Sequence, residues 1–195
     1  MGVYLSDRDK LILNFIEQYG GITINQAANM FFSGYKYGYD QARRRLRTMY
    51  QNKVVKRFKA DTNSEVQYYF NKPNSIHKSK LLDVYTTLNN IGNVVEFQRE
   101  LKIGNRKIDG FIELEVEDQE CISTYPLIIE VDYTHNTSLE KLKEIYYSNY
   151  FQADYDSFPS VLVIKKYEWQ DKFKTDLFYY KFINWDLLNL QEVFL

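Results

Sequence analysis

The sequence predicts an α+β protein built from two modules, one basic and one acidic. Hydrophobic residues make up 45% of the 195 residues, which is enough for a substantial core. Residues 1–72 hold 12 Lys and Arg against 6 Asp and Glu, whereas residues 73–195 hold 13 against 20. The stretch "NKPNS" near this change reads as a linker. We therefore expect a basic module at 1–73 and an acidic module at 74–195.

The first module reads as three helices followed by a hairpin. Ser6 and Asp9 fit a capping box that opens the first helix, and Thr23 or Asn25 caps a short second helix. Two strand-like runs then flank a polar turn. The third helix is expected from about residue 39 to 51, and the two strands cover 54–60 and 65–71. Three helices and a hairpin in this order are typical of a winged helix-turn-helix domain.

The third helix carries the residues that we expect to contact double-stranded DNA. Its apolar side chains fall on one face by the helical period, and basic side chains occupy the opposite face. Arginine pairs with guanine edges, and both Lys and Arg neutralise phosphates. A solvated basic face, RNA binding and protein docking are the alternatives. The apolar face comprises Ala42, Leu46, Met49 and Tyr50, and the predicted DNA-binding residues are Tyr37, Tyr39, Arg43, Arg44, Arg47, Lys53, Lys56, Arg57 and Lys59.

The second module reads as a helix, three strands, a helix and a strand. Thr137 and Glu140 form a capping box for its second helix. This order is the core order of the restriction-endonuclease-like fold. The expected helices cover 75–92 and 138–152, and the expected strands cover 93–101, 106–117, 127–134 and 158–166, with a loop at 118–126. A further strand at 177–184 and a helical tail complete the chain.

Three acids single out the centre of this module. Glu130 and Asp132 are two residues apart in a strand and share a face, and Asp109 lies on the preceding strand. The nuclease motif of this fold has an Asp followed by (Asp/Glu)-x-Lys, but Asp132 stands where the lysine belongs. Two interpretations stay open. The acids hold Mg²⁺ while Lys143 replaces the missing lysine, or Lys143 is a structural counter-ion and no cofactor is bound. We favour the structural interpretation.

Together these motifs resemble the replication-relaxation family of plasmid and phage proteins. Ile108 and Asp109 stand where the family has a short "PD" segment, and "EVD" at 130–132 matches its "E-[ILV]-D-x-x-T" strand end. Lys143 and Tyr147 match its helical Lys and Tyr. The chain departs from the pattern because Ile108 replaces the proline and the threonine is shifted. The resemblance implies a winged helix followed by an endonuclease-like domain.

Several functions remain compatible with these features. The first hypothesis is a DNA-binding accessory protein of a mobile element, acting in replication, DNA relaxation or transfer. Its acidic module then forms a homodimer or recruits a replication or transfer protein. The alternatives are a Mg²⁺-dependent endonuclease using Asp109, Glu130 and Asp132, and a transcriptional repressor. The single Cys121 forms no internal disulfide, and no apolar run suits a membrane, so we expect a cytoplasmic protein.

Overall fold

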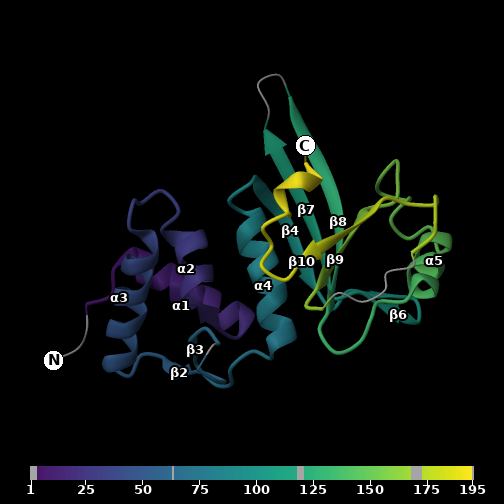
Figure 1. Cartoon of the computed structure of the whole chain (residues 1–195). Helices are drawn as coiled ribbons and strands as arrows, with labels where there is room; N and C mark the ends of the chain where they lie inside the picture. Colours follow the sequence, from purple (N-terminus) through teal and green to yellow (C-terminus); the bar gives the residue numbers. More distant parts are fainter. Residues whose placement is uncertain (1–3, 63, 118–120, 168–172, 195) are drawn as a thin grey trace. The chain divides into compact units, whose positions relative to one another are not determined.

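The computed structural model describes residues 4–62, 64–117, 121–167 and 173–194, and the chain divides into two compact units, 1–90 and 91–195. Both units combine helices with strands, which confirms the α+β class (Figure 1). The division falls after Asn90 and not after residue 73. The boundary predicted from the linker-like stretch therefore differs from the observed one.

Unit 1 consists of four helices and a small antiparallel sheet with the strand order β1-β3-β2. The Asp9 carboxylate accepts a hydrogen bond from the Ser6 N–H at 2.7 Å, and Ser6 caps α1, so the predicted capping box is confirmed. Thr23 caps α2, with Gln26 in the reciprocal position. The elements are α1 (Asp7–Tyr19), β1 (Ile22–Thr23), α2 (Ile24–Phe31), α3 (Gly38–Gln51), β2 (Lys56–Phe58), β3 (Gln67–Tyr69) and α4 (Ile76–Leu88).

Helix α4 belongs to unit 1, although its sequence was assigned to the second module. The side-chain amide of Gln26 on α2 donates hydrogen bonds to the Ser79 carbonyl at 3.0 Å and to Asp83 Oδ1 at 2.7 Å. The rings of Phe15 and Tyr85 stack with centroids 6.2 Å apart. These contacts join residues 53 to 70 positions apart in the chain, which is why the local pattern did not reveal them.

A glycine determines how α3 begins. A Cβ atom on Gly38 would lie 2.3 Å from the carbonyl oxygen of Phe32. We expect Gly38→Ala to lower the free energy of unfolding by about 1–3 kcal/mol, because the backbone must shift to admit the methyl group. Chemical denaturation followed by circular dichroism measures this change. Gly34→Ala is the matched control, since no atom within 4 Å would meet its Cβ, and an equal loss in both variants would contradict the clash.

Unit 2 is built on a five-stranded sheet with the order β10-β9-β8-β7-β4. Strands β4, β7 and β8 are antiparallel neighbours, whereas β8, β9 and β10 run parallel. A two-stranded ribbon, β5-β6, precedes β7. The elements are β4 (Asn93–Arg99), β5 (Lys102–Ile103), β6 (Arg106–Lys107), β7 (Gly110–Glu117), β8 (Ile122–Asp132), α5 (Leu139–Tyr147), β9 (Ser160–Lys165), β10 (Tyr180–Asn184) and the 3₁₀ helix η1 (Gln191–Val193).

Several elements of unit 2 differ from the prediction. Strand β8 begins at Ile122, inside the predicted loop, because it pairs with β7 as far as Glu117; residues 118–120 of that loop lie outside the described part. The predicted strand 106–117 is interrupted at Asp109, one residue before β7. Helix α5 ends at Tyr147 and not at 152. In the described part of the predicted helical tail, the helix is the short η1.

The two faces of this sheet bury different elements. Leu142 of α5 shares a buried cluster with Phe111 and Ile128, so α5 covers the face that carries them. Tyr125 contacts Phe194 with ring centroids 5.2 Å apart. Because Tyr125 alternates with Ile128 along β8, the C-terminal segment lies on the opposite face (Figure 1).

Candidate functional site

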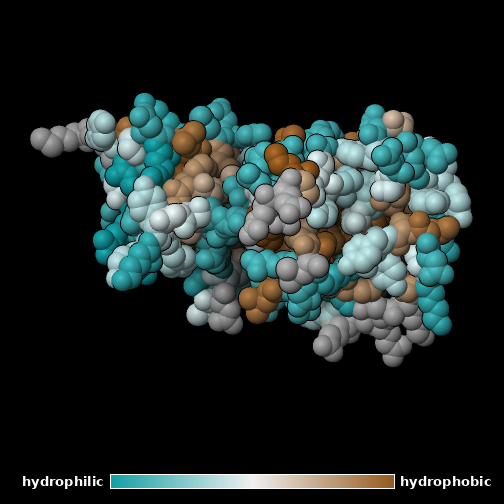
Figure 2. Space-filling view, turned by 90° about the horizontal axis from the view of Figure 1, so that it is seen from above, coloured by the Kyte–Doolittle hydropathy of each residue, from teal (hydrophilic) through white to brown (hydrophobic). Residues whose placement is uncertain are grey.

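The residues predicted to contact DNA form an exposed surface on unit 1, which we call the basic surface. All of them are exposed, while three members of the predicted apolar face of α3 are fully buried. Tyr50 is the exception: it is 41% exposed, and the guanidinium of Arg57 lies 5.3 Å from its ring centroid. In Figure 2 the surface on the left, over α3, is mostly hydrophilic. The basic surface comprises Tyr37, Tyr39, Arg43, Arg44, Arg47, Lys53, Lys56, Arg57 and Lys59.

Residues from two elements of the basic surface gather around one buried tyrosine. Tyr68 of β3 pairs in register with Arg57 of β2. Burial raises the pKa of Tyr68, and the charges of Arg57 and Arg47 act in the opposite direction, with a smaller contribution from Arg43. The guanidinium of Arg57 on β2 also lies 5.3 Å from the ring centroid of Tyr50 on α3, so β2 lies beside the end of this helix.

Arg45, in the middle of the arginine run, has a different role. Its Nε donates a hydrogen bond to Asp9 Oδ1 at 2.6 Å, and its terminal nitrogen donates to Asp9 Oδ2. Asp9 is 0% exposed. Burial opposes the charged form, but the hydrogen bonds from Arg45 and Ser6 outweigh it and hold the pKa of Asp9 below its usual value. Arg45 therefore fastens α3 to the start of α1.

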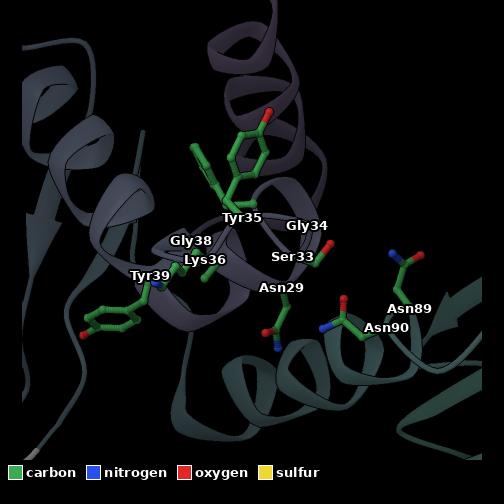
Figure 3. A pocket seen from close by; sticks show the side chains of 11 residues that line it. Asn29, Ser33, Gly34, Tyr35, Lys36, Gly38, Tyr39, Asn89 and Asn90 are labelled. Carbon is green, nitrogen blue, oxygen red and sulfur yellow. The ribbon is translucent and has the colours of Figure 1, made fainter.

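An open polar depression of about 710 Å³ adjoins the start of α3 (Figure 3). The side chains of Asn29, Ser33 and Asn90 face the same region in this view, whereas Tyr35 and Tyr39 point away from them. Among the residues that the structure describes, no acidic side chain lines it. Tyr39 belongs both to this depression and to the basic surface. Neutral hydrogen-bonding groups therefore lie next to the positive charge.

In unit 2 the three predicted acids meet at the end of β8. Gly110 pairs with Ile129, so Asp109 continues the register opposite Glu130. Its Oδ2 accepts a hydrogen bond from the Val131 N–H at 2.8 Å. Glu130 is 2% exposed and Asp132 is 5% exposed. Both alternate with Val131 and face α5, as the strand period predicted.

The counter-ion of Glu130 is Lys141, and the prediction of Lys143 is wrong. The Lys141 ammonium lies 2.7 Å from Oε1 of Glu130 and donates its hydrogen bond to Oε2 at 2.8 Å. Side chains in a helix tilt toward its N-terminus, so Lys141 in the first turn reaches back to the strand. Lys143 lies roughly 200° further around the helix.

A second local prediction fails at the same corner. Ser138, not Thr137, caps α5 through its side chain. Thr137 instead uses both its N–H and its hydroxyl to donate to Asp132 Oδ1, at 2.9 and 2.8 Å. Thr137 bonds to the buried carboxylate of Asp132, and Ser138 is the N-cap of α5. Lys141 then lies in the first turn of the helix, within hydrogen-bond distance of Glu130.

Burial dominates the electrostatics of this cluster. It raises the pKa of Glu130 to about 8, with a further increase from the Asp109 carboxylate and a partial offset from Lys141. Burial also raises the pKa of Asp132, although the hydrogen bonds from Thr137 act against it. Glu130 therefore keeps at neutral pH a proton that an exposed glutamate would release.

Hydrogen bonds from the chain itself hold the three acids of the predicted magnesium site. In the described ranges of the chain, no group of three or more His, Cys, Asp or Glu side chains could hold a metal ion. Asp109, Glu130 and Asp132 already accept hydrogen bonds from Val131, Lys141 and Thr137. These contacts join the three acids into one hydrogen-bonded network at the corner between β8 and α5.

Comparison with protein-family models, curated proteins and solved structures found no match to this chain. The resemblance to the replication-relaxation family thus stays a prediction from short motifs. No helix in the described part of the chain has both the length and the apolar character needed to cross a bilayer.

Proposed function

We propose that the protein binds double-stranded DNA through the basic surface of unit 1. The observation that carries this proposal is that every predicted contact residue is exposed on α3, its flanks and β2. Clustered lysines and arginines on one helix and an adjoining strand are the electrostatic footprint of a DNA-binding domain. Unit 1 as a whole holds 14 Lys and Arg against 7 Asp and Glu.

The topology of unit 1 supports a winged helix-turn-helix as the docking element. The chain order α1-β1-α2-α3-β2-β3 and the sheet order β1-β3-β2 suit that domain. Helix α2 packs on α3. In this proposal α3 enters the major groove and the turn between β2 and β3 follows the DNA backbone.

The cellular role follows from the sequence motifs. In unit 2, the antiparallel strands β4, β7 and β8 are followed by α5 and the parallel strand β9, which matches part of the order predicted for an endonuclease-like domain. The helix expected before these strands, α4, belongs to unit 1. In this proposal the domain serves dimerisation or the recruitment of a replication or transfer protein. We therefore propose an accessory role in the replication, relaxation or transfer of a mobile element.

Two variants test the DNA-binding surface. Arg44→Ala is expected to weaken specific binding by roughly 1–3 kcal/mol if the guanidinium reads a base edge. Lys56→Ala removes a phosphate contact, so it weakens binding to all sequences alike and lowers the salt dependence of log K by about 0.9. Gel-shift titrations of duplex DNA selected from a random pool, at several salt concentrations, measure both effects.

Lys102→Ala serves as the matched control because this exposed lysine lies on β5 of unit 2. It changes the net charge by the same amount as Lys56→Ala without altering the basic surface. The proposal is wrong if the Arg44→Ala/Lys56→Ala double variant binds duplex DNA as tightly as the wild type does. It is also wrong if Lys102→Ala weakens binding equally.

A further inference from the structure

The parallel strands β8, β9 and β10 end at one edge of the sheet of unit 2, and aromatic rings collect around a lysine there. The Lys166 ammonium lies 4.3 Å from the ring centroid of Tyr133 and 5.2 Å from that of Tyr167. The rings of Tyr133 and Trp185 have centroids 5.8 Å apart, inclined by 33°. We call Tyr133, Lys166, Tyr167 and Trp185 the edge cluster. These residues follow three separate strands, so only the sheet brings them together.

The edge cluster and the buried acids use different residues at this end of the sheet. Asp132 pairs in register with Lys165 and faces α5. Tyr133, Lys166 and Trp185 each come directly after the last residue of a strand, and Tyr133 contacts both Lys166 and Trp185. The carboxylates of Glu130 and Asp132 are also buried, so they present little charge to a ligand at this edge.

We propose that the edge cluster binds single-stranded nucleic acid, with unpaired bases stacking on its rings and a phosphate on Lys166. Tyr167 is 53% exposed, so its side chain is accessible from solvent. Hydrogen bonding to Tyr167, and also to Tyr133, holds the pKa of Lys166 above its usual value.

The chemistry of the cluster favours unpaired bases over a duplex. Base–aromatic stacking requires a free base face, which a duplex hides inside its own stack. A compact lysine charge neutralises a phosphate without reading its sequence. The same rings accept any base, so we expect little sequence preference. This surface is independent of the basic surface of unit 1, and it gives the protein a separate site for strands that are already open.

Trp185 provides a direct signal for binding. The chain has two tryptophans, so Trp169→Phe leaves Trp185 as the only indole fluorophore. In this background, titration with oligothymidylate of about 10 nucleotides is expected to quench the Trp185 fluorescence, because the base stacks against the ring. A duplex of equal length is expected to leave it unchanged. Lys166→Ala and Tyr167→Leu are each expected to weaken binding on the order of tenfold.

Conservative variants separate binding from folding. Tyr167→Phe keeps the ring and removes the hydroxyl, so it is expected to bind like the parent, whereas a purely structural role through the hydroxyl predicts a loss. Lys102→Ala controls for net charge. In the Trp169→Phe background, the further changes Arg44→Ala and Lys56→Ala are expected to leave the quenching of Trp185 by oligothymidylate intact. The test of the edge cluster therefore does not depend on whether the basic surface binds duplex DNA. The proposal is overturned if oligothymidylate does not quench Trp185, or if Lys166→Ala and Tyr167→Leu bind as tightly as Lys102→Ala.

Discussion

Replacing Arg45 by methionine is expected to lower the free energy of unfolding by about 3–5 kcal/mol. The change leaves the Asp9 carboxylate, which is 0% exposed, without its cationic partner. The Ser6 N–H and hydroxyl still donate to Asp9, but they supply no compensating charge. Urea denaturation followed by circular dichroism of the helices measures the effect. This residue is thus expected to matter more for stability than any arginine of the basic surface.

Arg44→Met is the matched control, because it makes the same substitution one position away on an exposed part of α3. We expect it to change stability by no more than about 0.5 kcal/mol. The double variant Asp9→Asn/Arg45→Met removes both charges, so it should recover part of the stability that Arg45→Met loses. If Arg45→Met and Arg44→Met destabilise the protein equally, the Arg45–Asp9 pair does not hold α3 in place.

The pH dependence of the Arg45 effect has a definite sign. The pKa of Asp9 is lowered in the folded protein, so its contribution to stability is present above the unfolded pKa of about 4 and is lost as the pH falls through the folded value. In Arg45→Met the buried carboxyl can instead relieve its cost by taking up a proton. The difference in stability between wild type and variant should therefore narrow in acid.

The second large effect concerns Glu130 and has the opposite dependence on pH. Burial raises its pKa to about 8 in the folded protein. In the unfolded chain Glu130 already loses its proton near pH 4.3. Over the window from about 4.3 to about 8, this group makes stability fall by at most ~1.4 kcal/mol per pH unit. Glu130→Gln removes the titration. Its stability relative to the wild type is therefore expected to increase steadily across this window.

Lys141→Met tests the partner of this carboxylate. Below about pH 8 Glu130 holds its proton, so the loss of Lys141 is expected to cost little. Above this pH the ionised carboxylate needs the ammonium, and the cost should grow with pH. Urea denaturation at pH 6, 7.5 and 9 on the Lys141→Met and Lys143→Met variants measures this. Lys141 would not be the partner of Glu130 if Lys143→Met lowered the free energy of unfolding more than Lys141→Met does. The same conclusion would follow if the loss of stability in Lys141→Met did not depend on pH.

The local sequence determined the features that depend on neighbours along the chain. The Ser6–Asp9 capping box needs only residues three positions apart. Burial of Ala42, Leu46 and Met49 follows from the helical period, which also places Arg44 and Arg47 on the exposed side. Strand alternation likewise put Glu130 and Asp132 on one face. In each case the geometry of a single element decides the outcome.

Only the tertiary structure decided which distant residues meet. Lys141 replaces Lys143 because Asp132 engages Thr137 and leaves Ser138 to cap α5, which fixes the turn that faces Glu130. Arg45 joins Asp9 across 36 positions and therefore differs from the exposed arginines beside it. The edge cluster combines the ends of three strands. These pairings depend on the register of one element against another, and no periodicity within a single element specifies that register.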